Sequence, residues 1–145
     1  MGEIIDEIDN EIIEELKKDS RQSVIKLAKK LKLPATTVHY RFARMMQRKV
    51  LKFTVNADRE YMGRPMVGYV LIKAMPGVDH AKLFREITMH QSIEEGSVIT
   101  GEFDMLLKIS VKDIQGLDAI VLRFLRTNKS IAETRTMLAY TSVER

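Results

Sequence analysis

The hydrophobic residues in the first third of the chain recur every three or four positions, in three separate stretches. This spacing places apolar side chains along one face of an α-helix, so it predicts helices over residues 6–19, 23–31 and 35–49. Pro34 has no amide hydrogen and suits only the first turn of a helix, so it separates the second predicted helix from the third.

The pattern changes after the third predicted helix. Apolar and polar residues alternate over residues 51–55, which predicts a half-buried strand, the wing or hinge that follows a helix-turn-helix. Residues 58–65 contain a glycine, a proline and few aliphatic residues, which is typical of a linker. We therefore predict two domains, residues 1–60 and residues 61–145.

The second domain alternates short apolar runs with helical stretches. The predicted elements are, in order, a strand at 66–75, a helix at 79–90, strands at 97–100 and 105–111, a helix at 114–126 and a strand at 134–143. The order β-α-β-β-α-β is ferredoxin-like, so the predicted fold class is α+β, a winged helix-turn-helix followed by a ferredoxin-like domain. One face of such a sheet lacks helices, and a second copy of the chain is the simplest cover, so we expect a homodimer.

Charge is distributed unevenly, although the net charge is only +4. Residues 1–16 carry seven acids and no base, whereas residues 17–53 carry twelve Lys or Arg and one acid. A surplus of eleven positive charges over this second stretch suits a surface that binds a polyanion such as DNA. The alternative is an ordinary solvated helical face.

The third predicted helix has an apolar side, with Val38, Phe42 and Met45, and an opposite side that contains no acid. The candidate DNA-binding residues on or beside that outer side are Thr36, Thr37, His39, Tyr40, Arg41, Arg44 and Arg48, and Gln47 lies on the same side. Arginine can donate two hydrogen bonds to guanine, and Thr, Tyr and Gln can bind phosphates or bases. Because a merely solvated face usually mixes Glu with Lys, the pattern favours a recognition helix.

Other classes of function find no support in the sequence. The chain contains no cysteine, which excludes disulfides and cysteine-ligated zinc. His39 lies on the third predicted helix, whereas His80 and His90 stand ten residues apart on another, so no spacing of metal ligands links them and we expect no metal site. No apolar run reaches the roughly 18–20 residues of a membrane span, and the acidic N-terminus is unlike a secretory signal. We expect a soluble cytoplasmic protein that is not an enzyme.

Two blocks of the sequence resemble the Lrp/AsnC (feast/famine) regulators. The first runs from Asp6 to Met45 and opens with Ile8-Asp9; the second is ITGEFDMLLKISV, residues 99–111, followed by TRTMLAYTSV. The resemblance implies a winged helix-turn-helix, an amino-acid-sensing ferredoxin-like domain, and dimers that associate into tetramers, octamers or larger assemblies. The chain departs from the family at residues 33–35, where Leu-Pro-Ala replaces the usual Leu-Ser-Pro.

The resemblance also implies an amino-acid effector between dimers, near the turn that joins the second and third strands. Carried onto this chain, it points to Thr100, Gly101, Asp104, Thr134, Arg135 and Thr136. Asp104 could bind the ammonium group of an amino acid, and backbone amides near Gly101 its carboxylate. The sequence Gly-Glu-Phe-Asp at 101–104 equally suits a plain hairpin turn, so both interpretations stay open.

The leading hypothesis is a sequence-specific DNA-binding transcription regulator, modulated by an amino acid and requiring no other cofactor. One alternative is an architectural protein that wraps DNA with little sequence preference, which would show salt-dependent binding to every sequence alike. The other alternative is an amino-acid sensor subunit that does not bind DNA.

Overall fold

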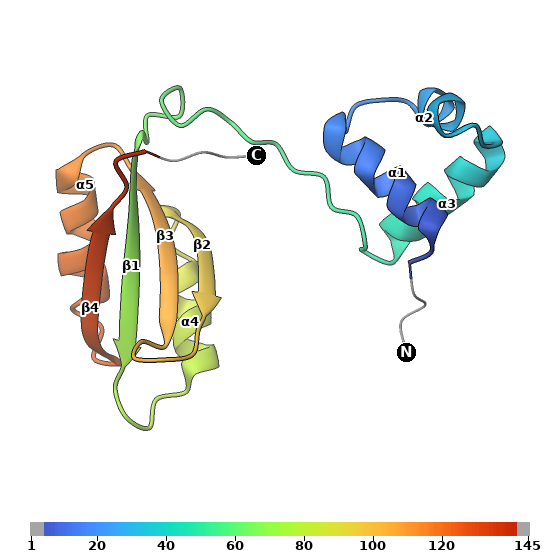
Figure 1. Cartoon of the computed structure of the whole chain (residues 1–145). Helices are drawn as coiled ribbons and strands as arrows, with labels where there is room; N and C mark the ends of the chain where they lie inside the picture. Colours follow the sequence, from blue (N-terminus) through green and yellow to red (C-terminus); the bar gives the residue numbers. More distant parts are fainter. Residues whose placement is uncertain (1–4, 142–145) are drawn as a thin grey trace. The chain divides into compact units, whose positions relative to one another are not determined.

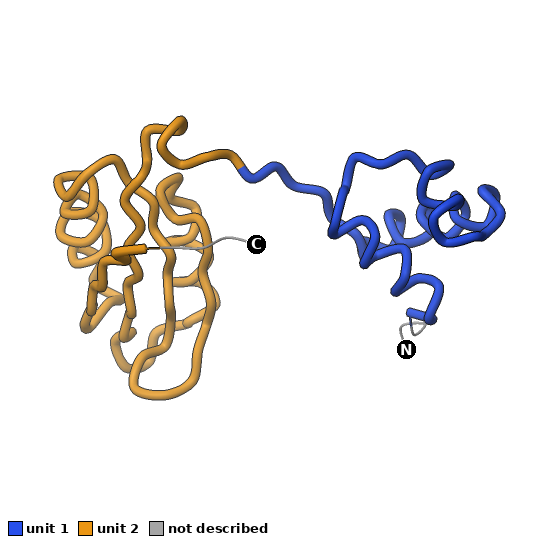
Figure 2. Tube along the Cα trace, turned by 45° about the horizontal axis from the view of Figure 1, so that its top comes forward, with its two compact units in different colours: residues 1–56 blue, residues 57–145 orange. Residues whose placement is uncertain are grey.

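The structure is a computed structural model that describes residues 5–141. The chain divides into two compact units, residues 1–56 and 57–145, shown in blue and orange in Figure 2. The first unit contains three helices, α1 (Glu7–Lys18), α2 (Val24–Leu31) and α3 (Ala35–Gln47), labelled in Figure 1. The three helices predicted in the N-terminal part are confirmed, with α3 ending two residues earlier than expected.

Side chains that precede the first two helices fix where they begin. The Asp6 carboxylate accepts a hydrogen bond from the Asp9 amide (2.9 Å), and the Asp9 carboxylate accepts one from the Asp6 amide (3.4 Å). This reciprocal capping box satisfies two amides that have no partner within the helix. Ser23 caps α2 by accepting from the Lys26 amide (3.2 Å). Pro34 precedes α3 and supplies no side-chain cap, so this helix start depends on packing.

Each helix of the first unit contributes a fully buried aliphatic side chain to one core. Ile12 comes from α1, Leu27 from α2 and Val38 from α3. Burying side chains of this size stabilises a small domain by about 1.5–3 kcal/mol each. The core therefore fixes α3 with its apolar side inward and its outer side away from the core.

The strand predicted over residues 51–55 is wrong for this chain, because residues 51–58 form no helix or strand. Alternation of apolar and polar residues describes which side chains can be buried, but a strand also requires a neighbouring strand to complete its hydrogen bonds. The segment has an exposed Val55, while Phe53 contacts Phe42 with ring centroids 6.0 Å apart. The predicted wing is thus not formed within the described residues.

The second unit has the predicted β-α-β-β-α-β order. Its elements are β1 (Met66–Ala74), α4 (His80–Thr88), β2 (Ile93–Val98), β3 (Met105–Val111), α5 (Ile114–Asp118), the π-helix η1 (Ala119–Leu125) and β4 (Ile131–Leu138). The antiparallel strands lie in the order β2-β3-β1-β4. β2 and β4 begin earlier than predicted and end at Val98 and Leu138, and residues 142 and 143 of the last predicted strand lie outside the described residues.

The helix predicted at 114–126 changes its winding midway, from α5 to η1. A π-helix is wound more widely than an α-helix, because its hydrogen bonds run from i to i+5. Ile120 and Leu125 have this spacing and are both buried against the sheet. With Leu117 and Val121, they keep the apolar side of the predicted helix against the sheet through the change of winding.

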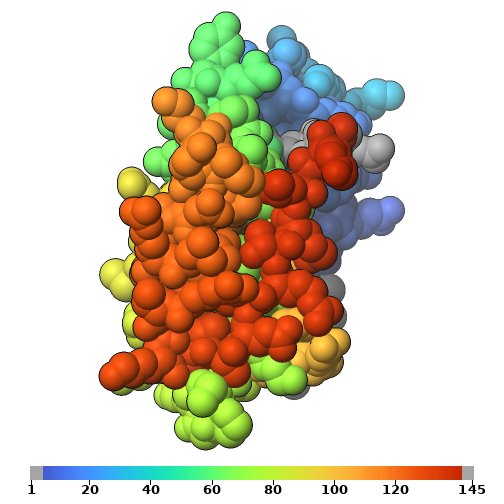
Figure 3. All heavy atoms as spheres, turned by 90° about the vertical axis from the view of Figure 1, so that its left-hand side faces the viewer, coloured from blue at the N-terminus to red at the C-terminus, as the bar shows by residue number. Residues whose placement is uncertain are grey.

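Helices cover one face of the sheet. Val70, Leu107 and Leu83 meet in a core formed with α4, α5 and η1, and Figure 3 shows α5 and η1 (orange) packed beside β4 (red). On the opposite face, Tyr69 and Leu71 are half-buried and carry no helix of this unit over them. An apolar sheet face without a cover is suited to packing against another protein surface.

The turn between α2 and α3 contains a strained residue. Lys32 ends α2 with φ 54°, in the left-handed region, and the next amide, that of Leu33, donates to the Ala28 carbonyl (3.0 Å). Glycine adopts this conformation without the steric cost that a Cβ atom brings. Lys32→Gly should raise the free energy of unfolding by about 0.5–1 kcal/mol.

The measurement is urea unfolding followed by circular dichroism, with Lys29→Gly inside α2 as the matched control. The control should lose about 1 kcal/mol, because glycine is a poor residue within a helix. A Lys32→Gly variant that is less stable than the parent protein would contradict the expected strain.

Candidate functional site

The predicted DNA-binding residues of α3 differ in exposure. Thr36, His39, Tyr40 and Arg48 are exposed, and the Tyr40 side chain is open to solvent for 67% of its surface. The other three, Thr37, Arg41 and Arg44, are half-buried. The most exposed functional groups on this face are therefore two hydroxyl groups, one imidazole and one guanidinium group.

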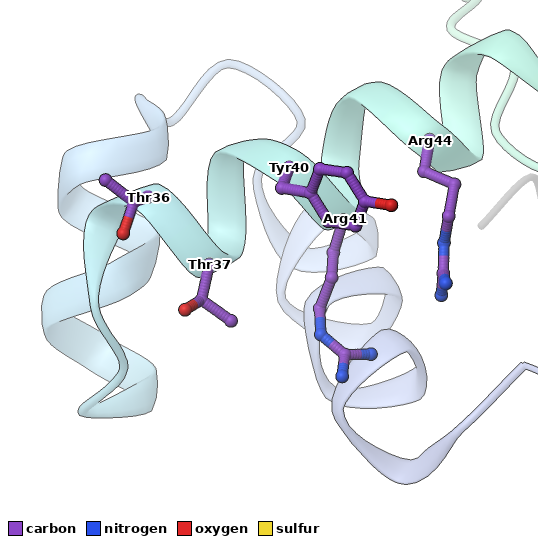
Figure 4. A pocket seen from close by; sticks show the side chains of 5 residues that line it. All are labelled: Thr36, Thr37, Tyr40, Arg41 and Arg44. Atoms are coloured by element: carbon purple, nitrogen blue, oxygen red, sulfur yellow. The ribbon is translucent and has the colours of Figure 1, made fainter.

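Five of these residues line one shallow hollow of about 380 Å³ on the surface of α3. They are Thr36, Thr37, Tyr40, Arg41 and Arg44, all shown in Figure 4. Figure 4 also shows that Arg41 and Arg44 extend from α3 to the same side. The helix thus presents three hydroxyl groups and two guanidinium groups around a single depression.

Both arginines of the hollow form ion pairs with the start of α1. Arg41 Nη1 donates to Asp9 Oδ1 (3.0 Å) and to a carboxylate oxygen of Asp6, and Arg44 Nη2 donates to Asp9 Oδ2 (2.8 Å). The Asp9 side chain is only 2% exposed, whereas that of Asp6 is 49% exposed. We call these four residues the Asp–Arg cluster. It ties the first helix to the predicted recognition helix.

The cluster also affects protonation. The hydrogen bond from Arg41, together with the Asp9 amide, holds the pKa of Asp6 below its ordinary value. A carboxyl group with a lowered pKa in the folded state adds stability above its ordinary pKa and loses that contribution as the pH falls. Asp6 therefore remains a carboxylate throughout the neutral range.

The turn predicted to bind an effector is held firmly to the sheet. The Asp104 carboxylate accepts a hydrogen bond from the Ala74 amide (2.8 Å), while its own amide donates to the Ile72 carbonyl (2.9 Å). Gly101 has φ 120°, a conformation that L residues with side chains rarely adopt. One carboxylate oxygen of Asp104 thus holds the turn to the end of β1, which leaves the other oxygen for a ligand.

Of the three predicted residues on β4, Arg135 is the one that reaches this turn. Its guanidinium lies 4.8 Å from the centroid of the Phe103 ring and 3.6 Å from the Glu102 carboxylate. Thr134 and Thr136 project to the other face of the sheet, because successive side chains of a strand alternate. Thr134 there accepts a hydrogen bond from Arg126 Nε (3.1 Å). The three predicted effector residues of β4 therefore fall on two faces of the sheet, and only Arg135 lies on the side that meets the turn.

Comparison with known proteins decides the family. Residues 5–46 match the AsnC-type helix-turn-helix domain, and residues 68–145 match the Lrp/AsnC ligand binding domain. The chain belongs to the Lrp/AsnC family. It is a helix-turn-helix transcription regulator, and the resemblance seen in its sequence is confirmed.

Similar proteins match the regulator over nearly its whole length. An uncharacterised HTH-type transcriptional regulator of Pyrococcus furiosus is 31% identical, with 99% of this chain and 98% of that protein aligned. The structure of LrpC from B. subtilis is 27% identical, with a TM-score of 0.81 over 97% of this chain and 98% of that one. The feast or famine regulatory protein of M. tuberculosis, complexed with L-methionine, has a TM-score of 0.86 at 23% identity, covering 98% and 96%.

The described part of this regulator contains neither a cluster of metal ligands nor a membrane-spanning helix. Within residues 5–141, no three His, Cys, Asp or Glu side chains gather closely enough to hold a metal ion. The helices of the same part of the chain are too short or too polar to cross a membrane.

Asp6 and Asp9 were not predicted from the sequence as partners of α3. A signal was present, since Asp9 falls on the same helical stripe as Ile12 and Leu16, the side that faces the core. A carboxylate on a buried stripe requires a cation or several donors. The sequence does not say which of the twelve basic residues between 17 and 53 supplies it.

Asp9→Asn should destabilise the N-terminal unit by about 3 kcal/mol, because it leaves two partly buried guanidinium groups without their shared carboxylate. Urea unfolding of the full chain, followed by circular dichroism, measures the change. Glu11→Gln, an exposed acid on the same helix, is the matched control and should change stability by less than about 0.5 kcal/mol. Equal stability of Asp9→Asn and the parent protein would show that the buried ion pairs contribute nothing.

Proposed function

We propose that this regulator reads duplex DNA with the outer face of α3. The observation that carries the proposal is the hollow on α3, where hydroxyl groups and guanidinium groups converge on a face without acidic side chains of its own. The proposed contact residues are Thr36, Thr37, His39, Tyr40, Arg41, Arg44 and Arg48. Two such helices in a dimer would enter successive major grooves and read a partly palindromic site.

The residues of this face have different proposed roles. Tyr40 and Thr36 are exposed and can reach base edges or phosphates directly. Arg41 and Arg44 are held by the Asp–Arg cluster, so they meet DNA as pre-oriented groups whose charge is partly balanced. Truncating either arginine would disturb the fold as well as the contact, so Tyr40 is the better residue for a test.

The two domains have separate proposed tasks. We assign DNA binding to residues 1–60, and effector binding and assembly to residues 61–145. The apolar sheet face around Tyr69 and Leu71 supports assembly into a dimer, and association into tetramers or octamers would follow from further contacts. In this proposal the regulator acts in the cytoplasm and catalyses no reaction. Its only small-molecule ligand is an amino acid.

Amino-acid binding is proposed for the turn at 100–104. The L-methionine complex of the M. tuberculosis protein, which shares this fold, supports an amino acid as the ligand class. In this chain the backbone amides beside Thr100 and Gly101 suit the carboxylate, and Asp104 suits the ammonium group. Arg135 lies beside the turn and would add a cation for the carboxylate. Thr134 and Thr136 would contribute only through a neighbouring copy or through the shape of β4.

The first test of DNA reading uses fragmented genomic DNA retained by the purified regulator at about 0.2 M salt, which suppresses much of the purely electrostatic binding. We expect enrichment of a few regions that share a partly symmetric motif. Uniform retention would favour an architectural protein, and no retention even at low salt would favour a sensor without DNA binding.

Tyr40→Ala should weaken binding to an enriched site by about 1–3 kcal/mol while leaving stability unchanged, because the side chain is exposed. Fluorescence anisotropy with a labelled duplex measures the affinity. Tyr61→Ala, which removes a tyrosine that is 95% exposed in the second unit, is the matched control and should bind like the parent protein. Equal loss in both variants, or none in Tyr40→Ala, would refute the proposed face.

Arg135→Met should weaken amino-acid binding at least about tenfold, because it keeps an apolar contact with Phe103 but removes the charge that faces the ligand carboxylate. Isothermal titration against the twenty common L-amino acids identifies the ligand and measures the loss. Arg123→Met, an exposed arginine on η1, is the matched control. Unchanged affinity in Arg135→Met would remove this residue from the site.

A further inference from the structure

The recognition helix is flanked by negative charge that belongs to another helix. Asp6 and Asp9 stand at the start of α1, and both bind Arg41 of α3. Asp9 is buried, so solvent and ligands do not reach it. Asp6 is half exposed, and its carboxylate lies at the surface, on a guanidinium group that lines the hollow.

The charge at the hollow is therefore lower than the sequence of α3 suggests. Two guanidinium groups, Arg41 and Arg44, are matched there by the carboxylates of Asp6 and Asp9. A DNA phosphate that approaches the hollow is attracted by the arginines and repelled by the exposed carboxylate. At physiological salt such forces decay over about 8 Å, so Asp6 acts only on phosphates close to Arg41.

We infer that Asp6 is a specificity-determining residue that lowers the affinity of the regulator for DNA of arbitrary sequence. Binding without sequence choice is almost entirely electrostatic, and it averages over many placements of the helix on the duplex. Some of these placements bring a phosphate beside Asp6. A specific complex is held by base contacts in one placement, which can keep phosphates away from the carboxylate. The inference rests on the proposed DNA-binding face.

The position allows charge to be changed without losing the helix start. Asp6 caps α1 through a side-chain oxygen that accepts from the Asp9 amide, and asparagine caps helices as well as aspartate does. In Asp6→Asn, Asp9 remains to hold both Arg41 and Arg44. The substitution therefore removes one surface charge and retains the cap and the buried ion pairs.

The test compares Asp6→Asn with Glu11→Gln, which removes one exposed negative charge from α1 at a residue outside the Asp–Arg cluster. Affinity for a random-sequence duplex is measured by fluorescence anisotropy at several salt concentrations, beside affinity for an enriched genomic site. Asp6→Asn should bind the random duplex about threefold to tenfold more tightly than the parent protein at about 0.1 M salt. It should gain less at the specific site, and Glu11→Gln should gain less at both.

The outcomes separate the inference from the proposed function. Equal or weaker binding of Asp6→Asn to the random duplex overturns the role of Asp6, as does an equal gain in Glu11→Gln. Failure of the parent protein itself to bind any duplex at low salt overturns the proposed function instead. If Asp6→Asn melts well below the parent protein, Asp6→Ser, which also supplies a capping oxygen without charge, repeats the comparison on the same terms.

Discussion

A carboxylate buried among apolar side chains requires cations or hydrogen-bond donors around it, and Asp9 imposes this requirement on the N-terminal unit. Its two oxygens bind Arg41 and Arg44, so α1 and α3 are joined by charge as well as by the contacts of Ile12 and Val38. Apolar packing alone tolerates small rotations of a helix, whereas two directed ion pairs to one buried group do not. The orientation of the proposed DNA-reading face of α3 therefore depends on a residue that lies on a different helix.

The positions of the helices could be predicted because helix formation depends on local spacing of apolar residues. The Asp9–Arg41 pair could not, because the two residues are 32 positions apart and many basic side chains compete for one carboxylate. The strand predicted at 51–55 was wrong for a related reason, since the alternation of apolar and polar residues does not reveal whether a neighbouring strand completes the hydrogen bonds. The change from α5 to η1 also escaped prediction, because both windings bury aliphatic residues at similar spacings.

The predicted effector residues of the second unit also combine what could and what could not be predicted from the sequence. The residue types at 101–104 predicted the turn that holds Gly101 and Asp104, whereas a role of these two residues in effector binding was implied only by the resemblance to the family. The three residues of β4 were named together from a resemblance, yet strand geometry sends Arg135 to one face and its two neighbours to the other. With Asp104 bound to the backbone of β1, the turn forms a fixed frame, so a ligand there would meet groups already in position.

The double use of Asp6 has an evolutionary consequence. One carboxylate both starts α1 and balances Arg41, but only the second task needs a negative charge. Aspartate and asparagine codons differ by a single nucleotide, and either residue starts the helix well. A single nucleotide change can therefore alter the charge of this surface while the fold stays intact. Related regulators can diverge in surface charge at this position more easily than at the buried Asp9.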